Sequence, residues 1–293
     1  MFDLIARFGI LYASLQESPA GALYRTGAYG VLDPSEKGAY SYFLGLTATK
    51  LIAGRYLDVP WLQHLDVYWG SLQPTFVGGV APHKPVGSRP DLVGLDTSGR
   101  WVVMEAKGRS NALPNSVLPS AKTQVGKVVS IGGKPPHLGV AVATSFKKGA
   151  FRVDWADPEP DEAGVELAIT VDQFASAYYA PLQDVLGADG EVVEAGGVAY
   201  RVRRVESADA LVGVDQRVVD DPVAGVYGQL AKTEGTPLSD EGRELEADGL
   251  KAPLGPVSSA YAGPDGVMVA LGPSWSTPVM ALDPRERGAV VRG

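Results

Sequence analysis

Helical and strand patterns alternate along the first two thirds of this chain, and that order constrains the fold more than any other feature. A helical pattern begins after Asp33, with Glu36 three residues later, which is a typical helix start. Two short apolar runs around a turn follow at residues 91–107, and a second helical pattern covers residues 119–131. The run LGVAVATSF at residues 138–146 indicates a fully apolar strand. This order predicts an α/β fold in which helices lie on the faces of a mixed central sheet.

The same patterns divide the chain into three parts. Residues 1–30 predict an N-terminal helix and a loop, and residues 31–188 predict the α/β core. Residues 189–293 predict a C-terminal extension or a second small domain of unknown role. The patterns weaken in this last part, although a hairpin is expected around Gly196 and Gly197.

Composition excludes several classes of function. The chain has 293 residues, of which 45% are hydrophobic, so it is long enough and apolar enough to bury a core. It has no cysteine, which excludes disulfides, thiol catalysis and cysteine-bound zinc. No apolar run reaches the length of a membrane span, and Asp3 stands where an export signal would carry Lys or Arg. We therefore expect a cytoplasmic protein that does not contact the membrane.

The charge of the chain is unevenly distributed. Its net charge is −8, which argues at first against a nucleic-acid partner. Residues 84–152, however, contain 11 Lys and Arg but only three acidic residues. A basic segment within an acidic chain favours either a surface that faces phosphate groups or an ordinary solvated basic face.

The stretch RPDLVGLDTSGRWVVMEAKGRS at residues 89–110 predicts a β-hairpin. Its three-residue turn would end on Gly99, which can take the left-handed conformation that such turns favour. The pairing that follows places Asp91 opposite Glu105. Because side chains alternate between the two faces of a strand, Asp91, Glu105 and Lys107 should share one face.

Two acids directly opposed in a hairpin destabilise it unless something compensates their charge. A divalent cation would do so, because Mg²⁺ binds one or two carboxylates and leaves its other positions for water and substrate phosphate. Lys107 could then orient the attacking water and neutralise charge on a phosphoryl group. The alternative is an exposed hairpin that carries a Glu/Lys pair on its solvent face.

The arrangement resembles the PD-(D/E)xK nuclease superfamily, which has the restriction-endonuclease-like fold. The resemblance rests on Pro90-Asp91, a gap of thirteen residues, and Glu105-Ala106-Lys107, on two adjacent strands between two helices. It implies that Asp91 and Glu105 bind the metal, Mg²⁺ or Mn²⁺, and that Lys107 positions water.

The resemblance covers roughly residues 30–175 and implies two further catalytic candidates. An acid on the helix before the sheet would be Glu36, although its place in a capping box already has a structural purpose. A polar residue on the helix after the motif would be Gln124, although such a residue is more typical of a solvated helix face. The basic residues expected to contact nucleic acid are Arg89, Arg109, Lys122 and Lys127.

Together the site and the resemblance predict a metal-dependent nuclease that acts on DNA, and the resemblance implies genome defence or repair as its context. The acidic C-terminal region could contact a protein partner, and the chain could act as a homodimer. The alternative function is a non-catalytic module that keeps the fold and binds nucleic acid or a protein.

Overall fold

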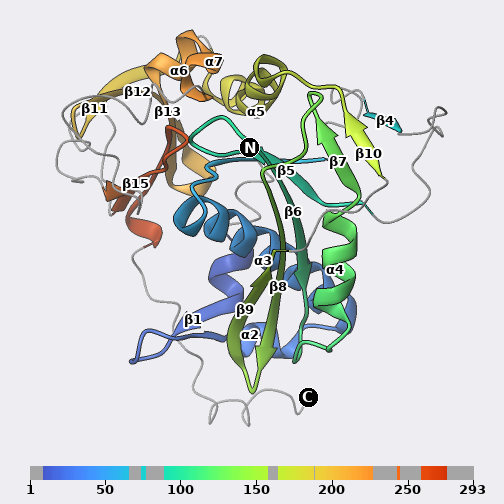
Figure 1. Ribbon diagram of the computed structural model, residues 1–293. Helices are drawn as coiled ribbons and strands as arrows, with labels where there is room; N and C mark the ends of the chain where they lie inside the picture. Colours follow the sequence, from blue (N-terminus) through green and yellow to red (C-terminus); the bar gives the residue numbers. More distant parts are fainter. Residues whose placement is uncertain are drawn as a thin grey trace.

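The centre of the molecule is a mixed sheet of seven strands with helices on its faces, as the sequence predicted (Figure 1). The computed structural model describes residues 9–65, 74–76, 89–157, 164–187, 189–226, 243–244 and 259–275. Along the sheet the strands are, in order, β1 (Leu15–Glu17), β2 (Leu23–Arg25), β9 (Ala150–Ala156), β8 (Leu138–Lys147), β6 (Trp101–Gly108), β5 (Leu92–Leu95) and β3 (Trp61–His64). Strands β6 and β8 are parallel, and the other neighbours are antiparallel.

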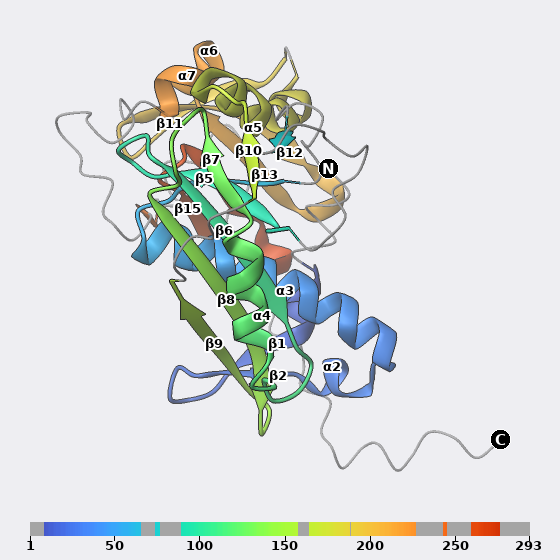
Figure 2. The ribbon, with the colours of Figure 1, turned by 45° about the vertical axis from the view of Figure 1, so that its right-hand side comes forward.

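Two helices cover opposite faces of this sheet (Figures 1 and 2): α3 (Pro34–Tyr56) and α4 (Val117–Val125). The alternation of side chains along β6 shows which face each helix covers. Met104 packs in one core cluster with Leu46 of α3, whereas its neighbour Val103 packs in another cluster with Ala121 of α4. A helix that crosses a bilayer needs about 20 apolar residues, and none of the helices in the described ranges meets the required length and hydropathy.

The start of α3 follows the predicted capping box. The Asp33 carboxylate accepts hydrogen bonds from the N–H groups of Ser35 (2.6 Å) and Glu36 (3.1 Å). The Glu36 carboxylate in turn accepts from the N–H of Asp33 (3.0 Å). These bonds satisfy N–H groups that have no partner within the helix, so the local sequence is sufficient to begin the helix here.

The helix predicted at residues 119–131 is wrong at both ends. It begins earlier, at Val117, and ends at Val125, while β7 (Val128–Ile131) is a strand. Strand β7 pairs in parallel with β10 (Val165–Leu167) in a small second sheet that also contains β4 (Pro74–Phe76). Its β-branched residues suit a strand, and pairing with β10, more than 30 residues away, decides against the helix.

The C-terminal part forms a third sheet. Its six antiparallel strands are, in spatial order, β11 (Glu191–Ala195), β12 (Val198–Val205), β13 (Ala210–Asp215), β16 (Val267–Leu271), β15 (Ser259–Ala262) and β14 (Arg243–Glu244). The predicted hairpin is confirmed, because Ala195 pairs with Val198 and the two glycines between them have positive φ angles of 59° and 79°. Further α-helices in the described residues are α2 (Gly27–Val31), α5 (Val171–Leu186), α6 (Gln216–Asp220) and α7 (Pro222–Ala224), and residues 9–14 are also helical.

Helix α5 packs between the central sheet and the C-terminal sheet. A single apolar cluster contains Trp61 of β3, Phe174 of α5 and Val214 of β13. The C-terminal sheet therefore shares its core with the α/β part.

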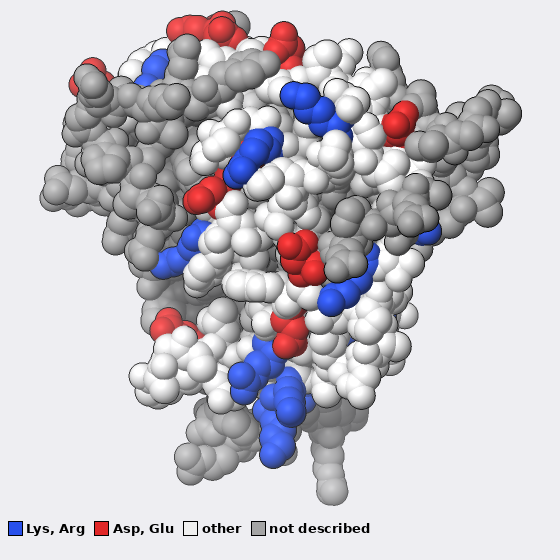
Figure 3. Space-filling view, viewed as in Figure 1, with Lys and Arg blue, Asp and Glu red and all other residues white. Residues whose placement is uncertain are grey.

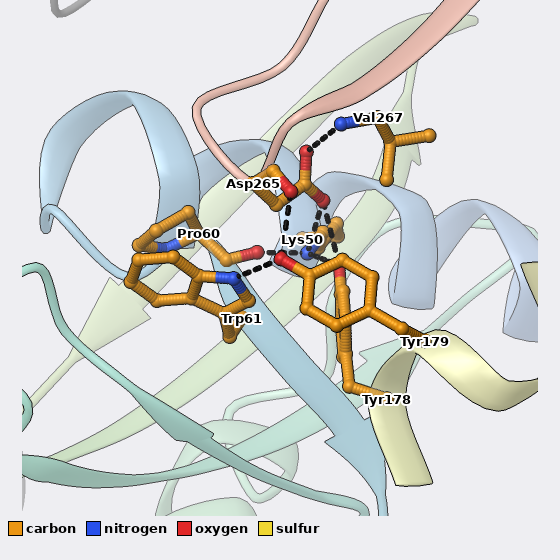
Figure 4. Close-up of polar contacts among 7 residues, drawn as sticks. All are labelled: Lys50, Pro60, Trp61, Tyr178, Tyr179, Asp265 and Val267. Carbon is orange, nitrogen blue, oxygen red and sulfur yellow. Dashed lines mark hydrogen bonds and ion pairs between the residues drawn. The ribbon is translucent and has the colours of Figure 1, made fainter. Parts of the chain in front are cut away.

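A network of buried and partly buried polar groups lies at the same junction (Figure 4). The Tyr179 hydroxyl accepts from the indole N–H of Trp61 (2.6 Å) and donates to the backbone carbonyl of Asp265 (2.7 Å). The Tyr178 hydroxyl donates to the Asp265 carboxylate (2.6 Å) and accepts from Lys50 Nζ (2.7 Å). The network joins α3, β3, α5 and the β15–β16 turn.

Candidate metal centre

The two acids of the hairpin lie opposite each other, immediately before β5 and near the end of β6. The strands pair in the predicted register, with Val93 opposite Val103, and Gly99 has a φ of 73° in the turn. The N–H of Asp91 donates to Glu105 Oε2 (2.9 Å), and the Asp91 carboxylate accepts from the N–H of Ala106 (3.1 Å). Each carboxylate is therefore held by the backbone of the opposite strand.

Glu105 is fully buried, with 0% of its residue surface exposed. Lys107 Nζ makes an ion pair with Glu105 Oε1, and the lysine side chain is one quarter exposed. Within the described residues, that same oxygen has no hydrogen-bond donor in suitable alignment. The Lys107 ammonium therefore compensates the charge of this buried oxygen without a well-aligned hydrogen bond.

The electrostatics of the Asp91–Glu105 pair favour an added cation. The pKa of Glu105 is raised to about 7, first by burial and then by the negative charge of Asp91, while Lys107 acts in the opposite direction. Burial also raises the pKa of Asp91, against the opposing effects of the Ala106 N–H and of Lys107. In the absence of another positive charge, the site therefore resists carrying two ionised carboxylates.

The carboxylates fit a hard divalent cation bound by few protein ligands. Asp91 and Glu105 would hold it through oxygen atoms, as Mg²⁺ and Mn²⁺ prefer. Among the described residues, no group of three or more acidic or histidine side chains could hold a metal. Water and substrate oxygen atoms would therefore have to complete the coordination.

Gln124 comes close to the acids. Its side chain is buried on α4, and its amide donates a long hydrogen bond of 3.4 Å to the backbone carbonyl of Arg89. Arg89 lies two residues before Asp91, so the C-terminal half of α4 is beside the candidate metal centre. The structure thus brings together Asp91, Glu105, Lys107 and Gln124.

Glu36 is not brought to this group. It lies on α3, which covers the face of the sheet opposite to that of Val103 and Glu105. Gly45 of α3 is the residue level with Lys107, because a Cβ on Gly45 would lie 3.1 Å from the Lys107 backbone. Glu36 is nine residues earlier, about 13 Å along the helix at 1.5 Å per residue.

Of the four basic residues expected to contact nucleic acid, two lie next to the hairpin in the chain and two lie on α4 or just after it. Arg89 is partly buried before Asp91, and Arg109 is exposed just after β6, where its N–H bonds to Thr144 (2.9 Å). Lys122 and Lys127 are partly buried, on α4 and just after it.

His64 is a neighbour of the acids that the sequence analysis did not identify. It ends β3 and pairs with Leu92, and its charged form lowers the pKa of Asp91. The sequence at residues 61–69 shows no clear helical or strand periodicity, and no local signal shows that β3 pairs with β5. Only the tertiary pairing places this histidine beside Asp91.

The assembled group can position water and a phosphoryl group. Two carboxylates with a bound cation and an adjacent lysine are suited to the hydrolysis of a phosphodiester. Neither a protein-family profile, nor a curated protein, nor a solved structure matches this chain.

Proposed function

We propose that this protein is a metal-dependent nuclease with a restriction-endonuclease-like core. The observation that carries the proposal is the buried Glu105 carboxylate, held opposite Asp91 and beside Lys107. A buried acid pair of this kind is costly unless it has a function or a compensating ligand. The position of the β5–β6 hairpin between helices α3 and α4 also supports the resemblance.

Each residue has a separate role in the proposed reaction. Asp91 and Glu105 hold a divalent cation, which when bound would polarise the phosphoryl group. Lys107 orients the attacking water and offsets negative charge that develops on the phosphate oxygens. Gln124 supports the backbone before Asp91 and so positions that carboxylate. DNA is the proposed substrate, and defence or repair the proposed context.

One observation favours a second candidate function. The ion pair between Lys107 and Glu105 already compensates the buried acid without a metal. In that case the hairpin is a structural feature of a non-catalytic module that binds nucleic acid or a protein.

Cleavage and metal titration on the same samples distinguish the two functions. Plasmid and single-stranded DNA are incubated with Mg²⁺ or Mn²⁺ and the wild type, Asp91→Asn, Glu105→Gln or Lys107→Met. We expect each variant to lose at least about 100-fold in cleavage rate, the usual scale for such groups. The acid variants should also lose metal binding by calorimetry.

Glu194→Gln serves as the control, because it neutralises an exposed acid on β11 and should cleave as the wild type does. If the wild type binds no metal with DNA present and cleaves nothing, the nuclease proposal is wrong and the binding module replaces it.

A further inference from the structure

An open groove of about 1060 Å³ lies at the β8–β9 end of the central sheet. Its floor is formed by β8 and β9, and one wall is formed by residues 112–115 and the first turn of α4. Tyr24 of β2 lines another side and is 38% exposed. The lining is thus partly apolar, with Leu113 and Leu118 on the wall.

The charged side chains of the groove are mainly cationic. Lys147, Lys148 and Arg152 are all exposed, and Asp154 is the one acid among the lining residues. Figure 3 shows Lys and Arg gathering where β8 and β9 meet at their turn. In a chain of net charge −8, such a site is complementary to an anionic ligand.

The groove is close to the candidate metal centre and on the same face of the sheet. Lys107 pairs with Ala143 of β8, and Ser145, which lines the groove, is two residues further along. Side chains two residues apart share a face and are about 7 Å apart along a strand. A ligand chain bound at the metal centre can therefore reach the groove over a short distance.

Lys148 presents its charge from a strained backbone position. It is the first residue of the two-residue turn between β8 and β9, and its φ is 54°. Turns of this type favour Asn or Gly at that position, and other residues pay about 1–2 kcal/mol for the left-handed conformation. Local folding preference therefore does not favour a lysine at this position.

We propose that this groove binds a single-stranded segment of the nucleic-acid substrate next to the bond that is cleaved. The inference rests on the proposed nuclease function and adds a binding site and a strand preference to it. Lys147, Lys148 and Arg152 contact phosphate groups, and a base stacks on Tyr24. Cations beside an exposed aromatic ring are how single strands are bound without sequence preference. The faces of bases are available for stacking on a ring such as Tyr24 in a single strand, whereas a duplex stacks them against one another.

Fluorescence anisotropy in EDTA tests the groove separately from cleavage. The probes are a labelled 12-nucleotide oligo(dT) and a 12-base-pair duplex. Lys147→Gln/Lys148→Asn/Arg152→Gln should weaken single-strand binding at least tenfold. It should also reduce the slope of log affinity against log salt by about 2, because three phosphate contacts are lost. Tyr24→Ala should weaken single-strand binding at least about fivefold and leave duplex binding unchanged.

Two controls exclude a loss of binding that comes from a general change in charge or from unfolding. Lys134→Gln removes one exposed lysine outside the groove and should bind as the wild type does, whereas Lys147→Gln should bind more weakly. Lys148→Asn alone should raise thermal stability, because Asn tolerates a positive φ, and yet bind more weakly.

The outcomes separate the two proposals. If the triple variant binds with wild-type affinity and salt slope while the wild type cleaves DNA, the groove assignment is wrong and the nuclease proposal is supported. If the triple variant loses binding but the wild type cleaves nothing with metal, the groove stands and the nuclease is wrong. Tighter binding of the duplex than of the single strand overturns the strand preference, and no binding of either probe overturns the groove.

Discussion

At the scale of single residues, the protein concentrates its chemistry in one buried carboxylate. Glu105 has no exposed surface, faces a second acid and is only partly compensated by Lys107. The folded protein therefore keeps a large share of Glu105 protonated at neutral pH when no cation is bound. Metal affinity should therefore depend on pH through the protonation of Glu105.

We expect the stability of the metal-free wild type to fall as pH rises from 5 to 8. The pKa of Glu105 is raised to about 7 in the folded state, so its contribution is full below the unfolded pKa of about 4.3 and is lost as pH rises through 7. The raised pKa of Asp91 likewise makes stability fall as pH rises. The loss should be on the order of 2–3 kcal/mol, measured by urea unfolding in EDTA.

Glu105→Gln is the matched comparison, because glutamine carries no charge at any pH. Its free energy of unfolding should change less between pH 5 and 8. Mg²⁺ should restore stability to the wild type at pH 8 and have little effect on the variant. Equal pH dependence of the two proteins would contradict the raised pKa.

At the scale of elements, the candidate site depends on how closely α3 packs against β6. A Cβ on Gly108 would lie 1.8 Å from the carbonyl oxygen of Ser41, and one on Gly45 would lie 3.1 Å from the Lys107 backbone. Two glycines, one on each element, thus allow the backbones to touch directly behind Lys107. The spacing between these elements sets how closely α3 lies behind the strand that carries Glu105 and Lys107.

Gly108→Ala should destabilise the protein by about 3 kcal/mol, since the methyl group forces the helix and strand apart. Gly38→Ala on the same helix is the matched control. No atom lies within 4 Å of its added methyl group, so it should stabilise the protein by up to about 1 kcal/mol. Chemical denaturation measures the free energy of unfolding of both variants. Similar losses in the two would show that the contact between α3 and β6 is not tight.

At the scale of the whole molecule, the C-terminal sheet is joined to the α/β core by apolar and polar contacts. The shared cluster contains Trp61 and Val214, and Tyr179 bridges Trp61 to Asp265. The polar groups at this junction are buried and paired, so each one restricts how the two sheets can be arranged.

Tyr179→Phe should therefore cost about 2–4 kcal/mol, because it leaves the Trp61 N–H and the Asp265 carbonyl buried without their partner. Tyr261→Phe, at a tyrosine that is 49% exposed, should change stability by less than about 0.5 kcal/mol. Tryptophan fluorescence and far-ultraviolet circular dichroism should report one coincident unfolding transition. Two separate transitions would show that the sheets unfold independently.

The sequence by itself determined the elements whose signals are local. The capping box at Asp33, the β5–β6 register with its turn at Gly99, and the hairpin at Gly196-Gly197 were all predicted. In each, residues within a few positions supply the hydrogen bonds or the positive φ that the element needs. The opposition of Asp91 and Glu105 was predictable for the same reason.

Only the tertiary structure decided the features that depend on distant partners. Strand β7 replaced the end of a predicted helix because β10 pairs with it, and His64 reached Asp91 because β3 pairs with β5. The position of Glu36 far from the acids follows from the packing of α3 on the other face. Burial of Glu105, and with it the raised pKa, is likewise set by the whole surrounding core, because desolvation depends on every neighbour and not on the local sequence.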